Sequence, residues 1–140
     1  MAVPPDRPRD HAGLQVLPYE ECLRLAASER VGRLAFASAG DIEVLPVNHV
    51  LDGSTIAFRS APGSKLGAAI ESAVVAFEVD HYDPLLRTGW SVLIKGRVEE
   101  VTEPSAVARL RSTALQPWNE RVARAHWMVV RADTITGRRL

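Results

Sequence analysis

The sequence lacks several features on which whole classes of proteins depend. Cys22 is the single cysteine among 140 residues, which excludes an internal disulfide framework and a cysteine-rich metal site. No apolar run approaches 18 residues and no signal peptide is recognisable, so we expect no membrane contact and a cytoplasmic location. The 17 basic and 17 acidic residues cancel, which removes any general electrostatic attraction to nucleic acid.

The motifs of common enzyme classes are also absent. The chain has no glycine-rich dinucleotide fingerprint, no P-loop, no His-Glu-x-x-His and no Cys-x-x-Cys. These absences argue against a Rossmann dehydrogenase, a P-loop NTPase and a zinc enzyme. The histidines at positions 11, 49, 81 and 126 have no ligand-like spacing, so we expect no metal site. The sequence identifies no catalytic residue.

What is present is an ordinary globular composition, with 46% hydrophobic and 24% charged residues. A chain of this length fits one domain with a substantial core. Residues 1–13 contain three prolines and almost no large apolar side chains, so we expect a flexible N-terminal arm there. The folded domain is predicted to cover residues 14–140.

Apolar periodicity and turn residues predict the order of the elements. The prediction is a helix at 18–28, strands at 32–38, 42–51 and 55–60, a helix at 64–71, strands at 73–79 and 90–101, a helix that opens at 102–104 and ends before Pro117, and a strand at 127–130. A loop is expected at 82–88. Gly96 lies inside a long strand and indicates a bulge of the kind that helps a barrel to close. Because hairpin connections dominate, this order predicts a mainly β (α+β) fold, an antiparallel barrel with flanking helices.

Residues 58–65 carry the strongest local signal. Arg59 and Ser60 end a predicted strand, a Pro-Gly turn follows, and Ser64 caps the next predicted helix, with Lys65 in its first turn. Two cations, two hydroxyl groups and the free amides of a helix start form a volume suited to phosphate. The same residues are also common in turns and helix caps that bind no ligand. The segment by itself therefore leaves open whether it is a phosphate site or an ordinary turn.

Five segments in order resemble the pyridoxamine 5'-phosphate oxidase-like family of FMN-binding split-barrel proteins. They are Val-Gly-Arg-Leu-Ala at 31–35, Leu-Pro-Val-Asn-His at 45–49, Phe-Arg-Ser at 58–60 with Gly-Ser-Lys at 63–65, Gly-Trp-Ser-Val at 89–92 with Lys-Gly-Arg at 95–97, and Ile-Thr-Gly-Arg-Arg at 135–139. The resemblance covers residues 14–140. It implies an antiparallel split β-barrel and a homodimer with FMN in clefts at the subunit interface, each cofactor touched by both chains.

The resemblance also implies which residues hold the cofactor. It implies that Arg59, Ser60, Ser64 and Lys65 bind the phosphate, and that the flavin ring runs along Pro46, Val47 and Asn48. Trp90 and Ser91 match the segment that reaches the cofactor from the long strand. Trp90 is equally compatible with plain barrel core.

Two departures from the family pattern argue against authentic pyridoxamine phosphate oxidation. Lys65 is followed by Leu66 instead of a second basic residue, and residues 127–140 contain no Arg-x-His element. The leading hypothesis is therefore an FMN-dependent oxidoreductase of a small-molecule substrate, with His49 as one conceivable proton source. The alternatives are a deazaflavin-dependent reductase, a flavin-binding carrier or sensor without catalysis, and a structural dimer with an empty cleft.

Overall fold

The computed structural model describes residues 7–60, 73–113 and 126–140. Seven strands and two helices lie within these ranges. They are β1 (Gln15–Val16), α1 (Tyr19–Ser28), β2 (Val31–Ser38), β3 (Asp41–Asp52), β4 (Thr55–Ser60), β5 (Val74–Asp83), β6 (Thr88–Glu100), α3 (Pro104–Arg111) and β7 (His126–Arg139).

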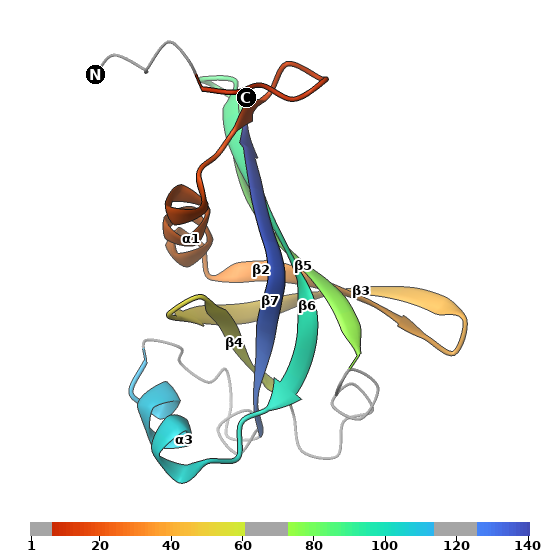
Figure 1. Ribbon diagram of the computed structural model, residues 1–140, viewed down its shortest axis with the longest axis vertical. Coiled ribbons are helices and arrows are strands. Elements are labelled where there is room, and N and C mark those ends of the chain that lie inside the picture. The colour runs from red at the N-terminus through yellow and green to blue at the C-terminus, as the bar shows by residue number, and fades with distance from the viewer. Residues whose placement is uncertain (1–6, 61–72, 114–125) are drawn as a thin grey trace.

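The strands form one antiparallel sheet that closes on itself. Its order is β1-β7-β4-β3-β2-β5-β6, and β7 also pairs with β6, so six strands make a barrel and β1 is added beside β7. Figure 1 shows the long strands β6 and β7 running the length of the molecule, with the β2–β3 hairpin projecting from the barrel. The predicted antiparallel split barrel with flanking helices is confirmed.

Side chains that alternate along each strand fill the barrel. Val92, Ile94 and Val98 of β6 are buried. The β6–β7 register shifts between Lys95 and Gly96, so the predicted bulge is confirmed. A Cβ atom at Gly96 would stand 1.9 Å from the carbonyl oxygen of Arg131, and only glycine permits this approach of the two backbones.

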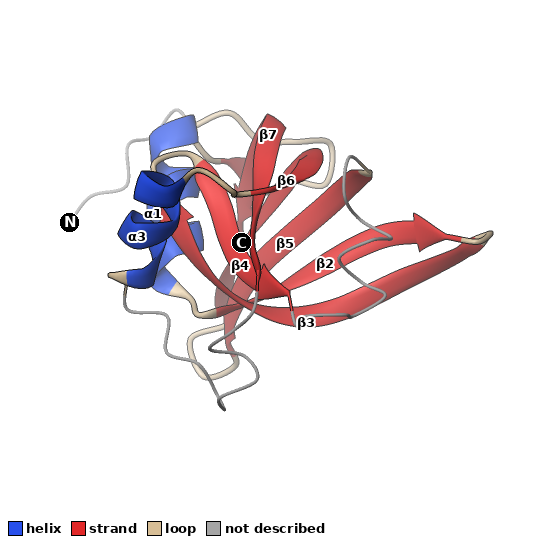
Figure 2. Cartoon of the chain, turned by 90° about the horizontal axis from the view of Figure 1, so that it is seen from below, coloured by secondary structure: helices blue, strands red, loops and turns tan. Residues whose placement is uncertain are grey.

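Helix α1 lies against β7 and β3 (Figure 2). Pro18 occupies the N-cap position, and Glu20 and Glu21 stand in the first turn, where the helix dipole favours acidic groups. Cys22 is fully buried, and burial raises the pKa of its thiol. A buried, protonated thiol is unreactive, which gives Cys22 a packing role.

Helix α3 packs on the outer side of the barrel. Glu103 caps it by accepting hydrogen bonds from the amides of Ser105 and Ala106. Leu110 then packs against Trp127 and Val129, residues of β7 whose side chains face away from the main core. These contacts form a second apolar cluster that holds α3 beside β4 and β7, as Figure 1 shows.

Three predictions differ from the structure. The loop expected at 82–88 is shorter, because β5 continues through Asp83 and β6 begins at Thr88. The last strand was predicted at 127–130 and extends through Arg139, because its polar second half pairs with β6 and β1. Strand β1 was not predicted. The helix expected at 64–71 lies outside the described residues.

The N-terminal arm stays a prediction, and its described residues contact the domain. Arg7 forms an ion pair with Glu21 at 2.9 Å, and the Asp10 carboxylate accepts hydrogen bonds from the amides of Ala12 and Leu14. Neither helix in the described part of the chain has the length and apolar character that a membrane span requires.

Candidate functional site

The residues predicted to hold phosphate begin at the end of β4. Arg59 pairs with Trp127 across the β4–β7 ladder, and its guanidinium carbon lies 4.4 Å from the centre of the indole ring. This cation–π contact orients the cation along the surface of the buried Trp127. Ser60 is 3% exposed and stands opposite His126. Ser64 and Lys65, the other predicted phosphate ligands, lie outside the described residues.

The Arg59 guanidinium has a hydrogen-bonding capacity that its protein surroundings do not use. Its Nε atom is buried and, within the described ranges, has no hydrogen-bond partner. Burial, and secondly the positive charge of Arg111 on α3, lower the pKa of Arg59. A guanidinium stays protonated at neutral pH even so. Arg59 is therefore a cation that an anionic ligand would stabilise.

The predicted ring-binding residues lie on the strand next to Arg59. Pro46, Val47 and Asn48 pair with β2 along one edge of β3. Along the other edge, the β3–β4 ladder ends at the pair His49 and Phe58, so β4 does not pair with residues 46–48 in the described structure. Among the described residues, no strand pairs with this edge of β3, which lies beside Arg59 and could offer its backbone groups to a planar ligand.

Trp90 and Ser91 lie at the other end of β7 from Arg59. They pair with Arg139 and Arg138 at the end of β7, whereas Arg59 pairs with Trp127 near its start. At about 3.3 Å per strand residue, the path along β7 between the two places is roughly 40 Å. The structure thus places residues 46–48 and 59–60 on adjacent strands and residues 90–91 at the other end of β7 from Arg59.

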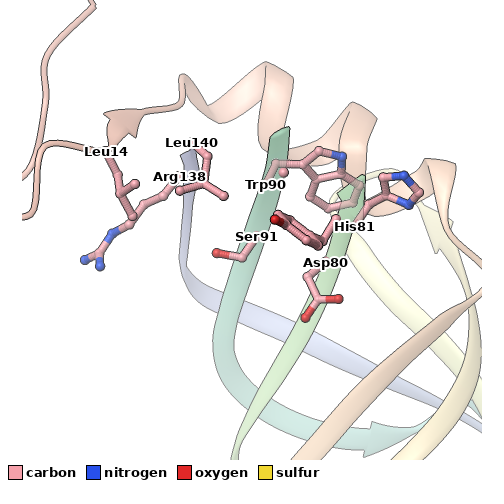
Figure 3. A pocket seen from close by; sticks show the side chains of 9 residues that line it. Leu14, Asp80, His81, Trp90, Ser91, Arg138 and Leu140 are labelled. Carbon is pink, nitrogen blue, oxygen red and sulfur yellow. The ribbon is translucent and has the colours of Figure 1, made fainter. Parts of the chain in front are cut away.

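A cavity of about 350 Å³ opens beside Trp90 (Figure 3). Trp90, Tyr82 and His81 form an aromatic part of its wall, and Leu14 and Leu140 form an apolar part. Figure 3 shows the Arg138 side chain extending away from Trp90, and its Nε pairs with Asp10 at 3.2 Å. The half-buried Trp90 is therefore part of a cavity wall as well as of the packed barrel.

A second cavity of about 220 Å³ contains a titratable group that the sequence analysis did not single out. Glu78 lines it together with Ser91 and Thr136. Burial, and secondly the neighbouring Asp80, raise the pKa of Glu78 to about 7, although Arg33 lies 3.3 Å away. The only sequence signal was a carboxylate at an alternating position within an otherwise apolar strand.

His49 is placed for a structural role instead of proton transfer. Its ring is 2% exposed, packs edge-on against Phe77, and its Nε2 atom lies 2.8 Å from the Ala26 carbonyl. Burial lowers the pKa of His49, so the ring is neutral near pH 7. Because the side chain faces the core, it does not reach a ligand in either cavity. The hypothesis of His49 as a proton source therefore finds no support in this geometry.

The chain was compared with known proteins. A family model described as pyridoxamine 5'-phosphate oxidase matches residues 18–139. The uncharacterized protein Rv0080 of Mycobacterium tuberculosis is 38% identical over 130 residues, which cover 89% of this chain and 84% of that protein.

Among solved structures, the FAD binding protein from Mycobacterium smegmatis is similar with a TM-score of 0.80 and 32% identity, over 90% of this chain and 99% of that one. A conserved protein of unknown function from Corynebacterium diphtheriae is similar with a TM-score of 0.76 and 29% identity, over 89% and 96% of the two chains.

Proposed function

The chain belongs to the pyridoxamine 5'-phosphate oxidase-like family, and from that premise we propose that it binds a flavin nucleotide. The observation that carries the proposal is Arg59, a cation over Trp127 whose buried Nε has no partner in the described ranges. A phosphate oxygen there would receive a charge-assisted hydrogen bond, roughly twice as strong as a neutral one. The relative from Mycobacterium smegmatis is named as an FAD binding protein, which supports the same ligand class.

The residues fit the two ends of a flavin nucleotide. Arg59 and Ser60, with Ser64 and Lys65, would hold the phosphate, and the free edge of β3 at Pro46, Val47 and Asn48 would face the ring. FMN and FAD share this part of the molecule, so both satisfy the site, with FMN as the smaller candidate. Bound flavin would supply hydride and electron transfer, and the protein would supply binding and orientation.

We further propose that the cofactor lies between two copies of the chain. Trp90 and Ser91 are at the other end of β7 from Arg59, which favours contacts to one flavin from two different chains. Flavin and the cavity wall at Trp90 would then meet across the interface.

An apolar surface on the outside of the barrel supports this assembly. Ile42, Val44 and Val74 are 80%, 58% and 63% exposed, and the pairs Ala37 with Ile42 and Ala35 with Val44 place them on one outer face of β2, β3 and β5. Ala76 of β5 continues this face beside Ala35. An antiparallel sheet in contact with water normally has polar residues on its outer face. We propose this face as the homodimer interface.

The proposed activity is that of a flavin-dependent oxidoreductase acting on a small-molecule substrate. The aromatic and apolar wall at Trp90, Tyr82 and Leu140 suits an organic substrate and would limit access of water. A carrier without catalysis differs from the enzyme in one measurable respect: its bound flavin would not be reduced by NAD(P)H faster than free flavin.

Titration of the purified protein with FMN, FAD and riboflavin tests the proposal. Arg59→Met keeps the packing over Trp127 and removes the charge, and we expect at least about tenfold weaker FMN and FAD binding with unchanged riboflavin binding. Arg131→Ala is the control, because Arg131 is an exposed arginine of β7 that pairs with Glu99 of β6. Unchanged FMN affinity in Arg59→Met would overturn the phosphate assignment. Absence of flavin binding, with binding of a deazaflavin coenzyme instead, would favour the deazaflavin alternative.

A further inference from the structure

Arg111, the last residue of α3, lies close to Arg59 although the two are far apart in sequence. The residue before it, Leu110, packs on Trp127, and Arg59 stacks on the same indole ring. Arg109, in the same helical turn, forms an exposed ion pair with Asp52 at 2.8 Å, and such a surface pair contributes little to the position of α3. Arg111 is accordingly near enough for its positive charge to contribute to lowering the pKa of Arg59.

The two guanidinium groups have no counter-ion in the described part of the chain. Arg111 forms no ion pair there, and neither does Arg59. The carboxylates of the surrounding elements already have partners: Asp52 with Arg109, Glu99 with Arg131, Glu100 with His126, and Glu103 with the first amides of α3. Two neighbouring cations without a carboxylate repel each other, and a bound anion would relieve that repulsion.

Basic residues are common in the last turn of a helix because the helix dipole favours positive charge there, whether or not a ligand binds. The dipole of α3 favours Arg109 and Arg111 in the last turn. That interaction accounts for a basic residue in the turn, and Arg109 with its partner Asp52 meets this requirement. It does not account for a second arginine near enough to the partly desolvated Arg59 to lower its pKa.

We propose that Arg111 is a further cation of the phosphate site, so that α3 and β4 together clamp the phosphate of the flavin nucleotide. This inference rests on the proposed function and adds an element that the sequence pattern around residues 58–65 does not contain. Arg59 binds from the strand side, and Arg111 closes the site from the helix side. The ligand chemistry is a phosphate ester, which FMN and FAD share.

The test compares Arg111→Ala with Arg109→Ala, a matched control in the same helical turn. FMN, FAD and riboflavin are titrated by flavin fluorescence, and unfolding without flavin is followed for each variant. We expect Arg111→Ala to bind FMN and FAD about tenfold more weakly and riboflavin as the wild type does. Arg111→Lys retains the charge and should recover most of the loss. Arg109→Ala should leave all three affinities unchanged.

The outcomes separate this inference from the proposed function. Equal losses for FMN and FAD support a clamp on the phosphate that they share, and a larger loss for FAD supports a contact with its second phosphate. If Arg111→Ala binds FMN and FAD normally while Arg59→Met does not, the role of Arg111 is overturned and the flavin site stands. If Arg111→Ala weakens riboflavin equally, the residue acts through folding and the clamp is overturned. A wild-type protein that binds no flavin overturns both.

Discussion

Replacing His49 by phenylalanine should show whether this histidine acts in folding. The Ala26 carbonyl belongs to the last turn of α1, where carbonyl groups have no partner within the helix. The His49 ring supplies that partner through Nε2, and the backbone amide of His49 donates to the Arg30 carbonyl. Phenylalanine keeps the ring against Phe77 but removes the donor. His49→Phe thus isolates the hydrogen bond that ties α1 to β3.

The expected loss at pH 7.5 is about 1 kcal/mol. Leaving a buried carbonyl without a donor costs about 1–3 kcal/mol. Part of this is offset because the Nδ1 atom of His49, which is buried without a partner in the described ranges, is removed as well. For a chain of this length, a change of 1 kcal/mol corresponds to a shift of about 3–4 °C in the unfolding temperature.

The loss should shrink as the pH falls. The pKa of His49 is lowered in the folded protein, so the unfolded state binds the proton more tightly below the ordinary value of 6.5. The wild type therefore keeps its full stability above pH 6.5 and loses up to about 1.4 kcal/mol by pH 5.5 from this residue. Phenylalanine does not titrate, so the two proteins should have nearly equal stability near pH 5.5.

Urea unfolding of both proteins at pH 7.5, 6.5 and 5.5 measures this convergence. The difference between the two free energies of unfolding cancels the other titrating groups, such as Glu78. A difference that stays constant over this pH range would show that the folded state does not disfavour the protonated ring. The assignment of His49 to the neutral core would then be wrong. FMN affinity at pH 7.5 should be the same in both proteins.

Three further predictions follow from the barrel and its outer surface. Gly96→Ala should lower the free energy of unfolding by about 3 kcal/mol or more, because the new methyl group meets the Arg131 carbonyl, and a backbone atom cannot move aside as a side chain can. A variant that unfolds at the same temperature as the wild type would contradict this prediction. The wild type should gain stability as the pH falls from 7 to 4.5, because the Glu78 carboxyl, whose pKa is raised to about 7, stabilises the fold only once it is protonated. Glu78→Gln should lack this gain. Identical dependence of the free energy of unfolding on pH in both proteins would contradict the prediction. Val44→Asp should convert a dimer to monomers in sedimentation velocity, and an unchanged dimer would place the interface elsewhere.

The first three barrel strands could be predicted to within one or two residues because local signals determine them. Apolar residues alternate in each strand, and turns at Ala39, Gly40 and Gly53 adopt positive φ angles between the strands. The second half of β7 could not be recognised in the same way. Residues 131–139 include arginines and threonines facing outward, and only their pairing with β6 makes them a strand.

The candidate site was predictable in its parts and not in its arrangement. Arg59 and the strand at residues 46–48 were assigned to one ligand, and the structure places them on adjacent strands. Trp90 was assigned to the same ligand and lies at the other end of β7 from Arg59. Arg111 was not singled out, because its proximity to Arg59 depends on α3 packing against Trp127.

The sequence by itself therefore determined the first barrel strands, the turns between them, the bulge at Gly96 and the types of side chain available to bind an anion. These depend on interactions between residues that are near in sequence, and the amino-acid order expresses them directly. Only the tertiary structure decided which of these side chains meet. Closure of the barrel by β6 and β7 separates Trp90 from Arg59, and the packing of α3 places Arg111 beside Arg59. Such long-range contacts result from burying apolar surface as a whole, and no short sequence pattern records them.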